Sequence, residues 1–174
     1  PVVYSGYKMG IKTVLHESNV IPGKTIKLLE KYATKIFINF EETLKYIKNK
    51  DKVLRVGNPL RKGYGVYEKE IIKRQLGINE QKVIVCFGGS LGASKINRAS
   101  IELIKNYIQF EKNIRFIWAT GRKEYFEIKE KLSSEGILNL KNVDVQEFIH
   151  NMPEVIACAD VVISRAGAVT LSEL

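Results

Sequence analysis

The sequence predicts an α/β fold built on parallel sheets. Short runs rich in β-branched residues alternate along the 174-residue chain with longer stretches of helical periodicity. Strands that alternate with helices are typical of parallel sheets whose faces are covered by helices. Hydrophobic residues make up 45% of the chain and aromatic residues 9%, which excludes disordered and fibrous classes. The apolar runs also fall far short of the roughly 18 residues that a membrane span needs.

The predicted strands are short apolar runs at residues 13–15, 35–38, 53–56, 83–87, 114–118, 143–145 and 160–163. The predicted helices cover residues 23–32, 41–47, 69–76, 93–110, 124–134 and 152–159. Boundary residues support this division: Pro22 stands at a helix start, Gly77 and Gly136 follow helix ends, and Asn151 occupies an N-cap position. The chain starts without Met and closes within another helical pattern, so we expect a fragment of a longer protein.

Residues 57–65, which contain three Gly and one Pro, follow the third predicted strand and predict an interdomain hinge. We therefore expect one domain over residues 1–57, a hinge over 58–65 and a second domain over 66–174. Residues 1–60 carry 11 basic and 5 acidic groups (+6), and residues 61–174 carry 17 and 14 (+3). The net charge of +9 favours anionic partners, namely nucleic acid, phosphorylated metabolites or an acidic membrane surface.

A glycine-rich turn at residues 87–94 leaves a strongly apolar predicted strand and opens a long predicted helix. Glycines such as Gly89 let backbone N–H groups approach an anion, Ser90 adds a hydroxyl donor, and a helix start carries about half a positive charge. The turn is thus a phosphate-binding loop or, alternatively, a plain tight turn. Its Gly-Gly-x-x-Gly spacing matches neither a Walker loop nor the dinucleotide fingerprint.

A second strand-to-helix junction closes the chain. Gly167 again permits close backbone approach, while Thr170 and Glu173 lie three residues apart on one helical face. A carboxylate at this place can accept hydrogen bonds from two ribose hydroxyls. The alternative for Glu173 is a first-turn acid favoured by the helix dipole.

Further candidate residues follow predicted strands, where α/β folds bind ligands. His16 is a general base, a metal ligand or a structural hydrogen-bond hub; His150 lies on a separate loop, so no zinc-site spacing exists. Arg61, at the hinge, suits a diphosphate by geometry and charge, or is an exposed hinge residue. Phe148 and Ile149 either flank a planar base or belong to the core.

Taken in order, five motifs resemble the MurG family of glycosyltransferases, which have the two-Rossmann (GT-B) architecture. They are His16-Glu17-Ser18-Asn19 with Pro22-Gly23, Val56-Gly57-Asn58-Pro59-Leu60-Arg61, Gly88-Gly89-Ser90-Leu91-Gly92-Ala93, Glu147-Phe148-Ile149 with Met152, and Ala159-Asp160 followed by residues 164–174. The chain departs from the family's usual Gln, Gln and Ser at Ser18, Leu91 and Ala166. The resemblance implies that residues 1–57 end the acceptor-side domain and that residues 66–174 begin the UDP-sugar donor domain.

The resemblance also implies roles for individual residues. Gly89 and Ser90, with the helix start at Gly167, Ala168 and Thr170, would bind the diphosphate and sugar of the donor. Arg61 would assist on the phosphate side. Phe148 and the Ile149 backbone would hold uracil, Glu173 would bind the ribose hydroxyls, and Asn19 would touch the sugar from the other domain.

The activity implied is inverting transfer of N-acetylglucosamine from UDP-N-acetylglucosamine to the 4-hydroxyl of the N-acetylmuramoyl residue of an undecaprenyl-linked pentapeptide precursor. The family's general base would precede this chain, so we expect the chain alone to be inactive. Because no Asp-x-Asp motif occurs, helix dipoles and Arg61 are the visible stabilisers of charge. We expect no metal and no other cofactor.

Two alternatives remain open at this stage. Another GT-B enzyme, such as a UDP-N-acetylglucosamine 2-epimerase or a lipid glycosyltransferase, would share the nucleotide site. A non-enzymatic nucleic-acid-binding module would need clustered basic and aromatic residues, whereas Lys24, Lys27 and Lys31 form one short stripe. Nucleic acid is therefore not an expected partner.

The implied lipid acceptor places the protein at a membrane. Cys86 and Cys158 resemble buried free thiols of a reducing compartment. The positive charge of residues 1–60, including Lys24 and Lys35, would attract anionic lipids. We expect a peripheral protein on the cytoplasmic face of the bacterial membrane, held also by an apolar patch outside this chain.

Overall fold

The computed structural model describes residues 1–78 and 80–174, which form two compact units. The first unit comprises Pro1–Leu60 and Gly167–Ser172, and the second comprises Arg61–Ala166 and Glu173–Leu174. The division between Leu60 and Arg61 falls inside the Gly- and Pro-rich segment. Residues 167–172, which the sequence assigns to the second domain, pack with the first unit.

The first unit contains a parallel sheet with the strand order β1-β2-β3. Its strands are β1 (Val14–Glu17), β2 (Lys35–Ile38) and β3 (Val53–Arg55), and its helical segments are α1 (Val2–Lys8), α2 (Lys24–Leu29), the 3₁₀ helices η1 (Glu41–Tyr46) and η2 (Lys50–Lys52), and most of α7 (Ala168–Glu173). A core of aliphatic side chains, including Leu15, Ile36 and Ile38, holds these elements together.

Several sequence predictions for this unit need correction. Helix α1 was not expected, because it buries no residue and therefore shows little apolar pattern. The helix predicted at residues 23–32 ends at Leu29, and the one predicted at 41–47 is the 3₁₀ helix η1. The strand predicted at 13–15 continues to Glu17, because His16 pairs in register with Phe37 of β2.

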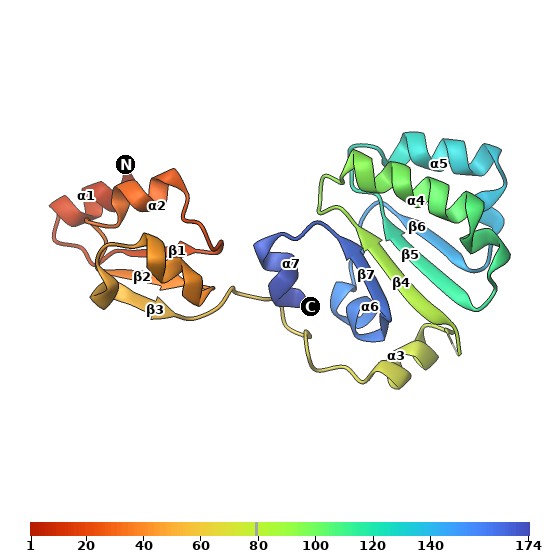
Figure 1. Cartoon of the computed structure of the whole chain (residues 1–174), viewed down its shortest axis with the longest axis horizontal. Helices are drawn as coiled ribbons and strands as arrows, with labels where there is room; N and C mark the ends of the chain where they lie inside the picture. Colours follow the sequence, from red (N-terminus) through yellow and green to blue (C-terminus); the bar gives the residue numbers. More distant parts are fainter. Residues whose placement is uncertain (79) are drawn as a thin grey trace. The chain divides into compact units, whose positions relative to one another are not determined.

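The second unit is built on a parallel sheet with the strand order β6-β5-β4-β7 (Figure 1). The strands are β4 (Lys82–Phe87), β5 (Ile114–Ala119), β6 (Val143–Gln146) and β7 (Val161–Ser164). The helical segments are α3 (Lys69–Gln75), α4 (Ser94–Asn106), η3 (Ile108–Phe110), α5 (Tyr125–Ser134), η4 (Ile137–Asn139) and α6 (Met152–Cys158). The predicted parallel α/β class is confirmed, and the predicted elements of this unit agree with the structure to within a few residues.

Helices cover both faces of this sheet, α4 and α5 on one side and α3 and α6 on the other (Figure 1). Because successive side chains of a strand point to opposite faces, Val83 and Val85 of β4 pack toward α6, while Cys86 packs toward α4. Each fully buried aliphatic side chain contributes about 1.5–3 kcal/mol. Cys86 and Cys158 are both buried and unpaired, as predicted, and burial raises the pKa of each thiol.

The strand order indicates where a ligand would bind to this unit. After β4 the chain adds β5 and β6 on one side, and then returns to place β7 on the other side of β4. In such sheets ligands bind at the carboxyl ends of the strands, where the direction of strand addition reverses. The loops after β4 and β7 meet at this point.

Candidate functional site

The turn after β4 is shaped by glycines that a side chain would block. A Cβ atom on Gly88 would lie 2.5 Å from the Ala93 nitrogen, and one on Gly92 would lie 2.1 Å from the Thr120 carbonyl oxygen. Gly92 also has a positive φ of 84°, which favours glycine. The turn is therefore packed directly against the loop after β5, with Ser90 exposed at its tip.

The start of α4 is anchored by buried polar groups. The Asn97 amide, only 2% exposed, donates to the Thr120 carbonyl (2.9 Å) and to the Glu124 carboxylate (2.8 Å). Hydrogen bonds from Ser94 and Asn97 lower the pKa of Glu124. Among the described residues the Ser90 hydroxyl has no hydrogen-bond partner, so it is available to a ligand in front of this helix start.

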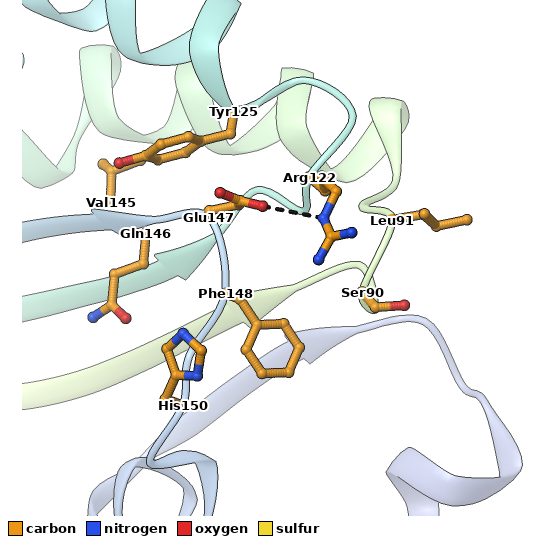
Figure 2. Close-up of a pocket in the computed structure, with 9 residues that line it drawn as sticks. All are labelled: Ser90, Leu91, Arg122, Tyr125, Val145, Gln146, Glu147, Phe148 and His150. Atoms are coloured by element: carbon orange, nitrogen blue, oxygen red, sulfur yellow. Dashed lines mark hydrogen bonds and ion pairs between the residues drawn. The ribbon is translucent and has the colours of Figure 1, made fainter.

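The loops after β4, β5 and β6, with the end of β6 and the start of α5, line an open cavity of about 700 Å³. Figure 2 shows the side chains that line it, which are Ser90, Leu91, Arg122, Tyr125, Val145, Gln146, Glu147, Phe148 and His150. Two residues predicted from the sequence, Ser90 and Phe148, thus meet in one cavity. Arg122, Glu147 and His150 were not assigned to the site, although their position shortly after β5 or β6 was a usable signal.

The cavity wall combines aromatic rings with an ion pair (Figure 2). The rings of Phe148 and His150 are 5.3 Å apart between centroids and inclined by 65°. Arg122 Nε lies 3.4 Å from Glu147 Oε1, and the Arg122 side chain is 84% exposed. Ile149 is fully buried in the core, so only its backbone is available for binding.

A cationic side chain stands where the loops after β4 and β7 approach each other. A Cβ atom on Gly89 would lie 3.0 Å from a guanidinium nitrogen of Arg165, the residue that follows β7. Positive charge beside a glycine turn and a helix start favours an anion. Arg165 was not singled out from the sequence, because its proximity to Gly89 depends on the pairing of β4 with β7.

Two other predicted residues, Arg61 and Glu173, lie beside the hydroxyl of Tyr64. Burial, followed by the proximity of Glu173, raises the pKa of Tyr64 to about 12. All three residues belong to the second unit. The sequence does not single out Tyr64, because it lies within the irregular segment 57–65.

Gly167, Ala168 and Thr170 lie with the first unit. The Asn58 amide donates to the Ala168 carbonyl (3.2 Å) and to the Ser172 hydroxyl (3.0 Å), which also accepts from Asn39 (3.3 Å). Asn58 therefore contacts both ends of α7, which is six residues long.

Asn19 is held by the buried carboxylate of Glu17. Its backbone N–H and side-chain amide both donate to Glu17 Oε1 (2.9 and 3.0 Å), and the Gly23 N–H donates to Oε2 (2.9 Å). Burial acts to raise the pKa of Glu17, but these hydrogen bonds lower it overall. No role for Glu17 was predicted from the sequence.

Both ring nitrogens of His16 face polar neighbours. Nε2 lies 2.9 Å from the Gly57 carbonyl oxygen and Nδ1 lies 3.4 Å from the Ser18 hydroxyl. These contacts match the structural alternative for His16. Within residues 1–78 and 80–174, His, Cys, Asp and Glu side chains form no group of three that could hold a metal ion.

The chain is similar to known glycosyltransferases. Residues 83–174 match the model of the glycosyltransferase family 28 C-terminal domain. A relative in Thermoanaerobacter sp. (strain X514) is named UDP-N-acetylglucosamine–N-acetylmuramyl-(pentapeptide) pyrophosphoryl-undecaprenol N-acetylglucosamine transferase and is 40% identical over the whole of this chain. A relative in Bacillus cereus with the same name, numbered 1, is also 40% identical. The chain spans about half the length of these curated relatives, 47% of each.

Solved structures share the fold. MurG of Acinetobacter baumannii superposes with a TM-score of 0.64 at 22% identity, covering 98% of this chain and 45% of that one. HepE of Anabaena, solved in complex with UDP and glucose, superposes with a TM-score of 0.53 at 13% identity, covering 92% and 48%.

Proposed function

Because the chain belongs to glycosyltransferase family 28, we propose that it is part of an inverting enzyme that transfers N-acetylglucosamine from UDP-N-acetylglucosamine. The acceptor is the 4-hydroxyl of the N-acetylmuramoyl residue in a lipid-linked peptidoglycan precursor, converting lipid I to lipid II. The names of relatives that are 40% identical over the whole chain support this substrate pair.

One observation carries the nucleotide half of the proposal. The Ser90 turn, which leads into α4, and the Phe148 loop both line one cavity at the carboxyl edge of a parallel sheet. A phosphate group fits the glycine turn and helix start, and a planar base fits the aromatic wall. An anion site and an aromatic wall in one cavity suit a nucleoside diphosphate.

The proposed reaction is a displacement at the anomeric carbon of the sugar. The acceptor hydroxyl gives its proton to a general base of the full-length enzyme as its oxygen forms a bond to C1. The bond from C1 to the β-phosphate oxygen breaks, and UDP leaves with the bonding electron pair. Negative charge therefore grows on the β-phosphate. Donors fixed in advance, such as the Ser90 hydroxyl and the N–H groups at the α4 start, stabilise that charge without reorganising.

The residue roles proposed from the sequence are retained. Gly89, Ser90 and Arg61 bind the diphosphate, Phe148 and the Ile149 backbone bind uracil, and Glu173 binds the ribose hydroxyls. Gly167, Ala168 and Thr170 bind the donor diphosphate and sugar, and Asn19 binds the sugar.

Titration calorimetry on the full-length protein tests this function. We expect UDP and UDP-N-acetylglucosamine to bind more tightly than NAD or free N-acetylglucosamine. Ser90→Ala should weaken UDP binding by about 1–3 kcal/mol, the range for a hydrogen bond to a charged group, because a direct donor to phosphate is lost. Thermal stability should stay nearly constant, as it should in the control Ser134→Ala on α5. Tighter binding of NAD than of UDP would overturn the proposal.

We further propose that the protein works at the cytoplasmic face of the bacterial membrane. Lys24, Lys27, Lys31 and Lys35 are all exposed, although only the first two lie within α2. In the described part of the chain, no helix has the length and apolar character of a membrane span. Attraction of these lysines to anionic lipids supports peripheral attachment.

A further inference from the structure

The hydroxyl of Tyr64 is buried without a partner. The Tyr64 ring packs against the core cluster beneath α6, which fixes its direction. The hydroxyl oxygen is covered, yet it lies outside hydrogen-bonding geometry to every described atom. Leaving such a group unpaired costs about 1–3 kcal/mol, so its placement calls for an explanation other than stability.

The backbone on either side of Tyr64 holds it in place. Gly63 and Gly65 both have positive φ, 111° and 72°, so the chain turns sharply before and after this residue. A Cβ atom on Gly63 would lie 3.1 Å from the Tyr67 ring and 3.2 Å from Pro153. Close packing around Gly63 therefore constrains the backbone immediately before Tyr64.

Two charged groups face the Tyr64 hydroxyl, the carboxylate of Glu173 and the guanidinium of Arg61. With a pKa of about 12 the phenol is protonated at neutral pH, as an ordinary tyrosine is, and it can act as a donor to the carboxylate. A neutral donor orients a carboxylate without placing a compensating positive charge beside it, as an arginine would.

We infer that Tyr64 is a positioning residue for Glu173, donating to one carboxylate oxygen when nucleotide is bound and so aiming the other at the ribose hydroxyls. This inference rests on the proposed function, in which Glu173 binds the ribose. Hydrogen bonds of this kind are often long in a free protein and shorten in the complex. The unpaired hydroxyl of the free structure is then paired in the bound state.

The test compares UDP with 2′,3′-dideoxy-UDP on full-length protein carrying Tyr64→Phe, which keeps the ring and removes the hydroxyl. We expect UDP affinity to fall about threefold to tenfold, the effect of one ordinary hydrogen bond. Affinity for the dideoxy nucleotide should not change, because it lacks the hydroxyls that Glu173 would hold. The KM for UDP-N-acetylglucosamine should rise by the same factor at nearly constant kcat.

Tyr67→Phe is the matched control, because the Tyr67 hydroxyl faces Glu154 instead. That variant should bind both nucleotides like the wild type. Tyr64→Phe should also have no additional effect in a protein that already carries Glu173→Gln.

Unchanged UDP binding in Tyr64→Phe, or an equal loss for both nucleotides, would overturn the positioning role. Failure of the wild-type protein to bind UDP at all would instead overturn the proposed function, so the two failures are distinguishable.

Discussion

Gly92 and Gly77 show how differently two glycines with positive φ are constrained. Both have left-handed backbone conformations, with φ of 84° and 66°. Around Gly77 no described atom lies within 4 Å of an added Cβ, whereas at Gly92 the Thr120 carbonyl oxygen would be 2.1 Å away. The Ser90 turn and the loop after β5 can pack together only when residue 92 has no side chain.

Gly92→Ala should therefore destabilise the protein far more than Gly77→Ala. At Gly77 an alanine would only strain the backbone, and we expect the free energy of unfolding to fall by about 1–2 kcal/mol. At Gly92 the added Cβ would also collide with the backbone of Thr120. We therefore expect the free energy of unfolding to fall by more than about 4 kcal/mol, which is exceptional for one substitution. Urea unfolding of the two variants measures the difference. Similar losses for both would contradict the close packing of the turn.

At the scale of secondary-structure elements, Asp160 ties the start of β7 to α3 and β4. Its carboxylate lies 2.8 Å from Lys69 Nζ, 3.7 Å from Lys73 Nζ and 3.7 Å from Lys82 Nζ, and it accepts the Val83 N–H at 2.8 Å. These contacts lower the pKa of Asp160 from 3.8 to about 2, and the hydrogen bond from Lys69 is the largest cause of this shift. The side chain is 19% exposed, so solvent screens these contacts only in part.

This pKa predicts a specific acid dependence of stability. The folded pKa lies below the unfolded one, so the stabilisation is complete above about pH 4 and is lost as the pH falls toward 2. Its size should be about 1–2 kcal/mol. Urea unfolding at several pH values should show this loss in the wild type and a smaller dependence in Asp160→Asn. The control Asp144→Asn, whose carboxylate lies 3.7 Å from Arg115, should keep the wild-type dependence.

At the scale of the whole molecule, charge is unevenly divided along the chain. Residues 1–60 carry +6 and residues 61–174 carry +3. Each well-placed basic residue contributes about 1 kcal/mol toward an anionic lipid surface, and salt weakens the attraction.

Co-sedimentation of the full-length protein with liposomes tests the proposed attachment. We expect more protein to pellet with anionic vesicles than with neutral ones at low salt, and the difference to shrink at moderate salt. Replacing Lys24, Lys27 and Lys31 by Gln should reduce binding to anionic vesicles, whereas replacing Lys123, Lys129 and Lys131 on and beside α5 should change it less. Equal binding to both vesicle types would remove the electrostatic contribution.

Much of the fold and part of the candidate site could be predicted from the sequence alone. Strands β4 and β5 and helices α4 and α5 were predicted closely, because periodicity and end signals depend on neighbouring residues. The glycine turn was equally visible, since its glycines and Ser90 are adjacent. Short elements at the surface, such as α1 and η1, were missed or misassigned because they bury too little for a pattern to form.

Only the tertiary structure decided which distant residues meet. The strand order brings Arg165 to Gly89, and the loops after β5 and β6 bring Arg122 and His150 to the cavity of Ser90. Packing decided that the side chain of Ile149 belongs to the core. It also set the Tyr64 hydroxyl beside Glu173, 109 residues further along the chain. These contacts join segments far apart in the chain, so their geometry depends on sheet order and on the close fit of side chains, which no local pattern records.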